Sequence, residues 1–258
     1  DYNVAVGHNA LTTNTTADNN TAVGANALLY NTTGGANTAV GLSALSSNTE
    51  GVSNTAVGNQ ALAANTTASN LVAIGRGALE SNTTGPYNTA VGYNCLDAST
   101  TGDYNNGFGH LALTAVTTGQ ANDCYGYKAG ATITTGSTNV CVGSFSMDSG
   151  GAQTGASNTA VGHASSRSLT SGYNNSALGL QTLYAISTGV NNTAVGADAG
   201  ADITSGSNNQ CLGLSAGKAN NPGGQITTAS NQIVVGNADS TNAHIQIDWT
   251  VASDKRDK

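Results

Sequence analysis

Small, larger apolar and polar residues alternate in a short phrase that returns along the whole chain. Two early copies read Asn-Thr-Ala-Val-Gly and end at Gly24 and Gly41. The same glycine recurs every 17 residues, apart from one interval of 19 and one of 23, and it marks fourteen copies. A fixed short period of this kind is typical of a solenoid, in which each repeat forms one coil and buries its apolar face on its neighbours. The motif glycines are Gly7, Gly24, Gly41, Gly58, Gly75, Gly92, Gly109, Gly126, Gly143, Gly162, Gly179, Gly196, Gly213 and Gly236.

Five positions of the repeat hold the same kind of residue in most copies. Asparagine stands four residues before the motif glycine in twelve copies, and leucine stands four residues after it in eight copies. A small residue, mostly alanine, lies two before the glycine, and a larger apolar residue, mostly valine, lies one before it. A second glycine or alanine recurs ten residues after it. We call these the asparagine, leucine, alanine, valine and second glycine columns. The alternation Thr-Ala-Val predicts a β-strand.

These columns predict which residues lie inside the coil. The valine and leucine columns, the only steady bulky apolar positions, are expected to form a thin interior, and the alanine column a close contact with another backbone on the opposite face. Glycine and asparagine adopt positive φ readily, so both glycine columns predict turns between two short strands. Stacked asparagines are expected to form an amide ladder between coils about 4.8 Å apart.

The repeat therefore predicts an all-β fold, a parallel β-solenoid or β-roll of about fourteen coils. An intertwined triple β-helix is the alternative. Residues 1–218 are expected to form the shaft, and residues 219–248 a degenerate last coil with an enlarged loop. Because one coil buries little apolar area, we expect several copies to associate, as a parallel homotrimeric fibre.

Composition narrows the possible partners. Charged residues make up 8% of the chain and the net charge is −7. Three of the seven basic residues lie in the last four positions, which leaves no basic stripe to neutralise phosphates, so we expect no nucleic-acid partner. No run of 18 apolar residues is present, so we expect no membrane insertion.

Two segments carry a resemblance to trimeric autotransporter adhesins. They read NLVAIGRGAL (Asn70–Leu79) and NTAVGYNCL (Asn88–Leu96). Both resemble the head repeats of that family, which carry an Asn-Ser-Val-Ala-Ile-Gly-like motif. The resemblance covers about residues 1–236 and implies a left-handed parallel β-roll assembled as a trimer.

The end of the chain, WTVASDKRDK (Trp249–Lys258), carries a second resemblance. It looks like the junction before the intramolecular chaperone domain of endosialidase-type phage tail spikes and fibres, where the chaperone cleaves itself off between Ser and Asp. Ser253, Asp254 and Arg256 match that pattern. The resemblance implies that residues 249–258 join the shaft to such a domain, with autocleavage at Ser253–Asp254.

Together these observations predict the structural and adhesive shaft of a bacteriophage tail fibre or spike, located on the virion. We expect it to mediate attachment to a host surface receptor, for which a polysaccharide is one candidate. A bacterial surface adhesin is the alternative, and a polysaccharide-degrading tail spike the third. Carboxylates lie in no repeated pair, so we expect no catalytic residues in the shaft.

Cysteines and histidines follow the repeat rather than any ligand spacing. Cys124, Cys141 and Cys211 lie in the alanine column and are expected to be small buried residues, as is Cys95. A Cys124–Cys141 disulfide is the alternative. His8, His110 and His163 share the position after the motif glycine, where a metal on a threefold axis is the alternative to a surface role. We expect no metal and no cofactor.

Receptor contacts are expected where the repeat is broken, because loops on a rigid scaffold carry binding residues more often than the scaffold does. The enlarged loops are Ser149–Ala156 and Ala219–Ala229. Aromatic residues that could stack on sugar rings are Tyr127, Phe145, Tyr173 and Tyr184. Regular threonine pairs such as Thr32-Thr33 are expected in turns, with ice binding as an alternative. The candidate receptor contacts are Ser149, Gly150, Gln153, Asn220, Asn221 and Gln225.

Overall fold

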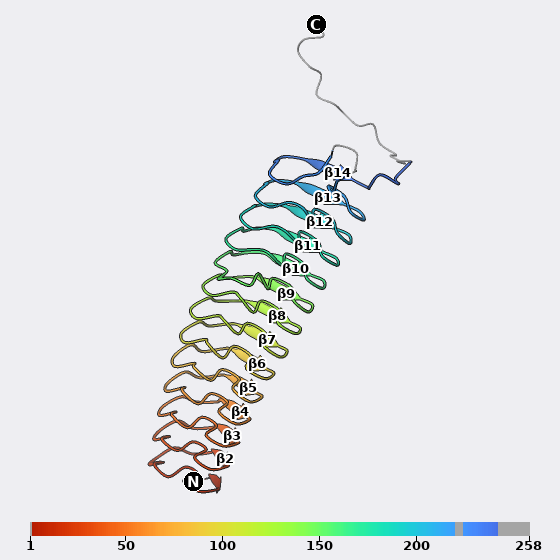
Figure 1. Cartoon of the computed structure of the whole chain (residues 1–258). Coiled ribbons are helices and arrows are strands. Elements are labelled where there is room, and N and C mark those ends of the chain that lie inside the picture. Colours follow the sequence, from red (N-terminus) through yellow and green to blue (C-terminus); the bar gives the residue numbers. More distant parts are fainter. Residues whose placement is uncertain (1, 220–223, 242–258) are drawn as a thin grey trace.

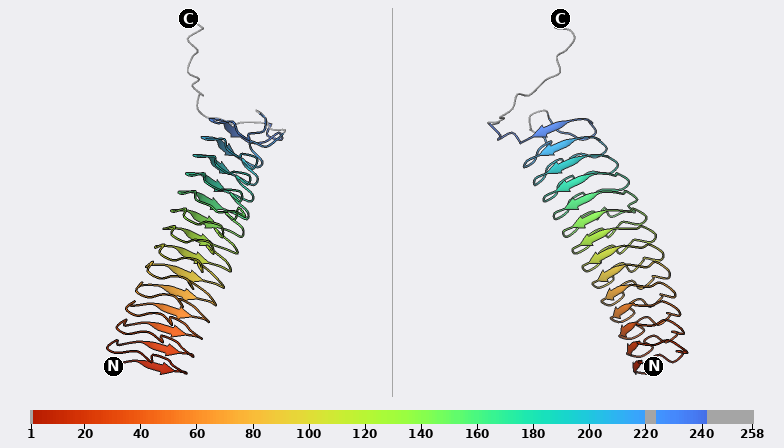
Figure 2. Two further views of the ribbon diagram at one scale, coloured as in Figure 1. Left: turned by 60° about the vertical axis from the view of Figure 1, so that its left-hand side comes forward. Right: turned by 180° about the vertical axis from the view of Figure 1, so that it is seen from behind.

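The chain forms a straight rod of stacked coils, which confirms the predicted parallel β-solenoid (Figure 1). The computed structural model describes residues 2–219 and 224–241. Fourteen parallel strands lie in one sheet, in chain order. Figure 2 shows the strands running along one side of the rod. The strands are β1 (Val4–Val6), β2 (Thr21–Val23), β3 (Thr38–Val40), β4 (Thr55–Val57), β5 (Val72–Ile74), β6 (Thr89–Val91), β7 (Asn106–Phe108), β8 (Asp123–Tyr125), β9 (Val140–Val142), β10 (Thr159–Val161), β11 (Ser176–Leu178), β12 (Thr193–Val195), β13 (Gln210–Leu212) and β14 (Ile233–Val235).

Each strand pairs with the next in the register of the repeat. Ala5 lies opposite Ala22, and Cys124 opposite Cys141, one coil apart. The prediction of two strands per coil is wrong for the described residues, where each coil has one three-residue strand and completes its circuit through turns. Outside the strands, the described residues form one isolated bridge, Ile133 to Gln153.

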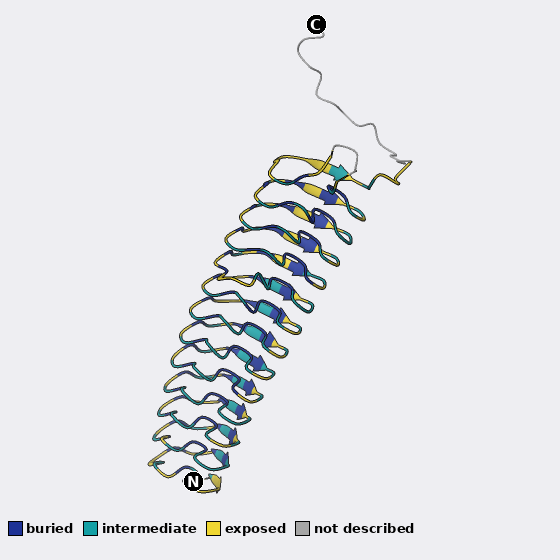
Figure 3. Ribbon diagram, viewed as in Figure 1, coloured by how far each residue is buried: buried dark blue, intermediate teal, exposed yellow. Residues whose placement is uncertain are grey.

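The interior of the coil differs from the sequence prediction. The alanine column is inside, with Ala22 and Ala39 fully buried, whereas the valine column faces outward, with Val40 and Val57 each 36% exposed. Figure 3 shows a buried residue beside more exposed ones in the strands between β1 and β14. The space inside the strand takes only small residues: from β2 to β13 the column holds alanine, glycine or cysteine, and a Cβ placed on Gly107 would lie 2.5 Å from Cys95 Sγ and 3.4 Å from Leu96 Cδ1. A methyl group facing a leucine therefore fills the space.

The asparagine column forms the predicted ladder between coils. The backbone N–H of Asn122 donates to Asn105 Oδ1 at 3.1 Å, and Asn122 Nδ2 donates to the same oxygen at 2.9 Å. Asn122 Nδ2 also donates to the Gly136 carbonyl of the next coil at 2.9 Å. These side chains are fully buried, so the hydrogen bonds offset the cost of removing the amides from water.

The two glycine columns are explained by close stacking of coils. Gly7 has a φ of 135°, and a Cβ on it would lie 2.6 Å from the Gly24 carbonyl oxygen. Gly34, in the second glycine column, has no positive φ, so the predicted turn conformation is wrong there. A Cβ on Gly34 would instead lie 2.8 Å from Asn31 Oδ1. Positive φ occurs at non-glycine turn residues such as Leu28, at 50°.

A second inner column lies seven residues after the motif glycine, and it changes character along the rod. In the first coils it holds buried asparagines; for example, Asn48 Nδ2 donates to Asn31 Oδ1 at 2.8 Å. In the later coils it holds apolar residues such as Ile133 and Ile203. We call it the seventh-position column. Its members are Asn14, Asn31, Asn48, Asn65, Asn82, Ser99, Val116, Ile133, Leu169, Ile186 and Ile203, with Ile226 at the equivalent place in the coil that contains the second enlarged loop.

Candidate functional surfaces

The outward face of the sheet is an apolar stripe along the rod. The valine column provides it, with Ile74 at 41%, Leu178 at 52% and Val195 at 40% exposed. Exposed apolar residues just after the motif glycine, such as Leu42 and Leu180, widen it. We call this surface the valine face. Its valine-column members are Val6, Val23, Val40, Val57, Ile74, Val91, Phe108, Tyr125, Val142, Val161, Leu178, Val195, Leu212 and Val235.

The valine face is large for a surface left in water. Fourteen strands at about 4.8 Å spacing give a length of roughly 60 Å, and the two outward positions of each strand lie about 7 Å apart. The product is on the order of 400 Å². The valine column provides about half of it, because the first residue of most strands is threonine or another polar residue. Parallel sheets, moreover, are usually covered on both faces. The valine face therefore has the properties of an interface.

Aromatic side chains on the valine face and beside it pack on one another from coil to coil. His110 lies between Tyr93 and Tyr127, with ring centroids 5.1 and 5.4 Å apart. Phe108 stacks on Tyr125 at 5.0 Å. The stacked rings cover one another's faces, so this packing accounts for His110 without a ligand. Among the described residues, no three metal-binding side chains gather in one place.

The four cysteines are free and buried, and the structure places no Cys124–Cys141 disulfide although the two residues are paired. Burial raises the pKa of the Cys95 thiol to about 12. Burial, and then the hydrogen bond with Cys141, raise the pKa of Cys124 well above its usual value. A thiol that stays protonated is a weak nucleophile and metal ligand, so these residues act as small core side chains.

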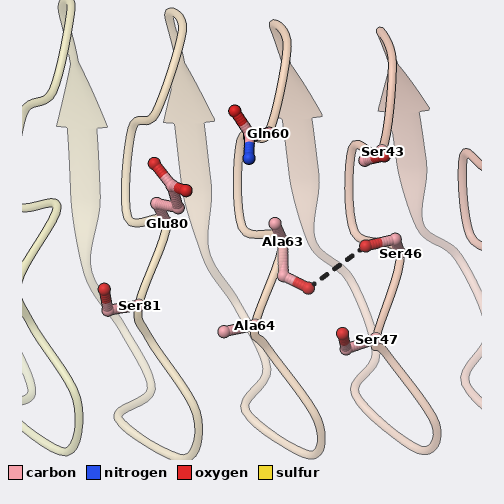
Figure 4. Close-up of a pocket in the computed structure, with 8 residues that line it drawn as sticks. All are labelled: Ser43, Ser46, Ser47, Gln60, Ala63, Ala64, Glu80 and Ser81. Carbon is pink, nitrogen blue, oxygen red and sulfur yellow. Dashed lines mark hydrogen bonds between the residues drawn. The ribbon is translucent and has the colours of Figure 1, made fainter.

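The side of the coil opposite the strand carries shallow hollows. Because the leucine column contacts the alanine column across the interior, the residues that follow it point away from the sheet. Figure 4 shows one such hollow, of about 460 Å³, on three consecutive coils. Hydroxyl, amide and carboxylate groups border it, and Ser46 Oγ donates to the Ala63 carbonyl at 3.3 Å. The lining residues are Ser43, Ser46, Ser47, Gln60, Ala63, Ala64, Glu80 and Ser81.

Two further hollows on this side meet at Tyr184. One, of about 300 Å³, is lined by Asp148, Ser149, Gly150, Arg167, Ser168 and Tyr184. The other, of about 310 Å³, is lined by Gln181, Tyr184, Ala185, Asp198, Ala201, Asp202 and Lys218. We call the pair the Tyr184 groove. Most of its charges have partners: Lys218 Nζ lies 3.6 Å from Asp198 Oδ2, and the Arg167 guanidinium lies 5.2 Å from the Phe145 ring centroid.

The predicted receptor contacts fall into three groups. Ser149 and Gly150 line the Tyr184 groove, and Gln225 Nε2 donates to Asp202 Oδ2 at 2.8 Å at its other end. Gln153 is fully buried, and neither amide atom has a hydrogen-bond partner, so its side chain does not reach the surface of the coil. Its side chain turns inward where the enlarged loop rejoins the coil. Asn220 and Asn221, and the predicted cleavage residues Ser253 and Asp254, lie outside the described residues.

Sequence reasoning missed the groove because it depends on stacking. Arg167 and Tyr184 occupy the same position of adjacent coils, 17 residues apart, and this regular spacing is the signal that would have brought them together.

The threonine pairs have a structural role: Thr32 Oγ1 donates to the Thr49 carbonyl at 3.0 Å. In the described part of the chain, no helix is long and apolar enough to span a bilayer.

Comparison with protein-family models, with curated proteins and with solved structures gave no match for this chain.

Proposed function

We propose that the chain is the shaft of a bacteriophage tail fibre or spike, a rod of three parallel copies that presents a host-binding surface. The observation that carries this proposal is the valine face. It is long, apolar and straight, as a lateral contact between identical rods requires. The family resemblances supply the number three and the attachment role.

We still propose a trimer, but the surface through which the copies contact one another differs from the one that the sequence predicted. We expected the alanine column to make the contact between copies, and the structure places that column inside. The valine face takes this role because its side chains can interdigitate with those of parallel copies and leave water. Covering the apolar half, about 200 Å² per copy, at ~25 cal/mol per Å² would contribute on the order of 5 kcal/mol per copy before association entropy is subtracted.

The proposal is tested by placing charge on the valine face. The triple variant Val57→Asp, Ile74→Asp and Val91→Asp puts carboxylates on three adjacent strands. The control Ala64→Asp, Ser81→Asp and Ala98→Asp changes the same three coils on the side opposite the strands. Analytical ultracentrifugation should give three times the chain mass for the parent and the control, and a smaller mass for the valine-face variant. A parent that sediments as a monomer would reject the trimeric shaft.

The attachment role has its own measurement. Host cells that adsorb the parent phage should be protected when they are first incubated with the purified rod, because the rod occupies the same receptors. Absence of competition at saturating rod concentration would reject a receptor-binding role and leave a spacer.

A further inference from the structure

We propose that the copies lie in register in the trimer, with the same coil of each copy at the same height, and that Asp123 of one copy pairs with Lys128 of the next to fix this register. The inference rests on the proposed trimer and adds the relative placement of its copies. The regular valine face repeats in every coil, so it fits a partner nearly as well after a shift by one coil. The register therefore has to come from residues that break the repeat, as single polar residues do in coiled coils.

The outward face of the sheet departs from the repeat at β7 and β8, near the middle of the rod (Figure 1). In most strands the first outward residue is threonine or aliphatic and the second is aliphatic. The outward residues are instead Asn106 and Phe108 in β7, and Asp123 and Tyr125 in β8. Asn106 Nδ2 donates to Asp123 Oδ1 at 2.7 Å. Among the described residues, the other carboxylate oxygen of Asp123 has no hydrogen-bond partner, so it is available to a second copy.

The coil that contains β8 carries opposite charges at the two edges of this face. Asp123 begins the strand, and Lys128 follows the strand at the other edge, where its Nζ lies 5.8 Å from the Tyr127 ring centroid. Asp123 is the only charged residue at the first position of the fourteen strands, and Lys128 is the only cation two residues after a motif glycine. Within one copy, the described residues form no ion pair between them. The two charges therefore mark a single height on the rod.

A ring of three identical copies brings the two edges together. Around a threefold axis, one edge of each copy meets the other edge of the next copy, because the contact is heterologous. Copies in register would place Asp123 beside Lys128 of the neighbouring copy three times. A shift by one coil would instead place it beside Leu111 or Phe145, which hold the same position in the adjacent coils. The carboxylate would then meet an apolar side chain, which disfavours the shifted arrangement.

The rings between the two charges favour a second copy over a carbohydrate as the occupant of this face. Tyr125 is 41% exposed and stacks on Phe108 at an interplanar angle of 9°. Tyr127 is also 41% exposed and lies between His110 and Phe145. Because neighbouring rings cover their faces, these rings are poorly placed to stack on sugars. Rigid aromatic residues flanked by charges of both signs are suited to contact the same surface of another copy.

The test reverses each charge in the full chain. Asp123→Lys would bring three added ammonium groups beside Lys128, and Lys128→Asp would bring three added carboxylates beside Asp123. Each single variant should raise the concentration at which half of the trimer dissociates by about tenfold or more, measured by sedimentation equilibrium. The double variant should return to within about threefold of the parent, because the pair is restored with its signs exchanged. The matched control Glu80→Lys makes the same charge change on the side opposite the strands and should shift that concentration by less than about twofold.

A mixture of the two single variants shows whether the pair joins different copies. Every contact between unlike chains in a mixed trimer restores one acid and one base. Equal amounts of the Asp123→Lys and Lys128→Asp chains, refolded together, should therefore associate more tightly than either chain alone. A rescued double variant without a rescued mixture would place the pair within one copy and overturn the proposal.

The remaining outcomes separate this inference from the proposed shaft. A parent trimer that tolerates both single reversals would overturn the pairing of Asp123 with Lys128, and so would a double variant as weak as the single ones. Both results would leave the trimeric shaft intact. A parent that is monomeric would reject the shaft proposal itself, so the two failures are distinguishable.

Discussion

The first and the later coils of the rod fill the same interior in two different ways. Up to Asn82, the seventh-position column is asparagine and the leucine column is leucine. From Ile133 onward the seventh-position column is mostly isoleucine or leucine, and the leucine column becomes Gly130, Met147, Ser166, Leu183, Gly200 and Gly217. The strands and their register do not change between the two regions.

The difference shows that the two columns are filled as a pair. A Cβ on Gly130 would lie 2.6 Å from Cys124 Sγ and 3.0 Å from Ile133 Cδ1, so these two side chains fill the space beside that glycine. The exchange is not made in every coil, because Leu183 and Ile186 are both fully buried in one coil. In the first coils, leucine supplies the apolar volume and the asparagine amides bond to each other. In the later coils, isoleucine supplies the volume and no ladder is needed. We call these the polar and the apolar filling.

The largest expected effect comes from placing the polar filling in the apolar region. Ile186→Asn should lower the free energy of unfolding by about 4 kcal/mol, since burial worth about 2 kcal/mol is lost and an amide without partners costs about 2 more. Its neighbours in the column, Leu169 and Ile203, offer no hydrogen bond. The midpoint of urea unfolding measures the loss, and the control Ile186→Val should cost about 1 kcal/mol. Equal losses in the two variants would contradict the pairing.

The reverse exchange tests the polar region. Asn65→Ile removes the donor to Asn48 Oδ1, now at 2.9 Å, and the acceptor of Asn82 Nδ2, now at 3.1 Å. We expect a loss of about 3 kcal/mol from the two groups left unpaired and from crowding against Leu62. Adding Leu62→Gly should recover part of the loss if the columns are filled as a pair. A double variant less stable than Asn65→Ile alone would show that they are independent.

An effect of similar size is expected where the apolar filling leaves no room for a methyl group. Gly200 has a φ of 59°, and a Cβ on it would lie 2.8 Å from Leu183 Cδ2 and 3.1 Å from Ile203 Cδ1. Gly200→Ala should cost about 3 kcal/mol, from crowding and from the left-handed backbone together. Gly150→Ala is the matched control, because Gly150 has a φ of 74° and no atom within 4 Å of the added Cβ. The control should show the backbone cost alone, about 1 kcal/mol. If the urea midpoints of Gly200→Ala and Gly150→Ala were the same, crowding would not contribute to the loss of stability at Gly200.

Much of this architecture could be predicted from the sequence because it repeats. The spacing of the motif glycines predicted the coils and their parallel stacking, and the asparagine column predicted its ladder. The prediction of which strand positions face inward failed because it ranked residues by size: Val40 is larger than Ala39, yet the inward position of the strand takes only a small residue such as alanine or cysteine. The Tyr184 groove was not predictable because its walls come from coils and loops whose relative placement no single repeat encodes.

Alkaline pH should lower the stability of the rod through a cysteine of a kind that the first coils lack. The coils up to Asn82 contain no cysteine, whereas Cys95 begins a series that continues at Cys124, Cys141 and Cys211. Because the pKa of Cys95 rises from 9.0 to about 12 on folding, its contribution is intact below pH 9 and is lost as the pH rises toward 12. One pH unit above 9 should cost about 1.4 kcal/mol. Urea midpoints at pH 8 and pH 10 should fall further apart for the parent than for Cys95→Ala, whose alanine matches Ala78 and Ala112 in the adjacent coils. Equal decreases would exclude Cys95 as the source.

The boundary between the two fillings gives the smallest effect and the only expected gain in stability. The ladder ends at Asn82, whose Oδ1 has no partner, and the next member of the column, Ser99, is buried with its hydroxyl unpaired. Ser99→Asn would place an amide donor where each earlier coil has one, beside Leu96, which belongs to the polar filling. We expect a gain of about 1 kcal/mol, seen as a higher urea midpoint. The same change at Ser81, on the outer side of the coil, should have little effect. A loss of stability at Ser99 would mean that Val116 already imposes the apolar filling on its neighbour, and that the boundary lies one coil earlier.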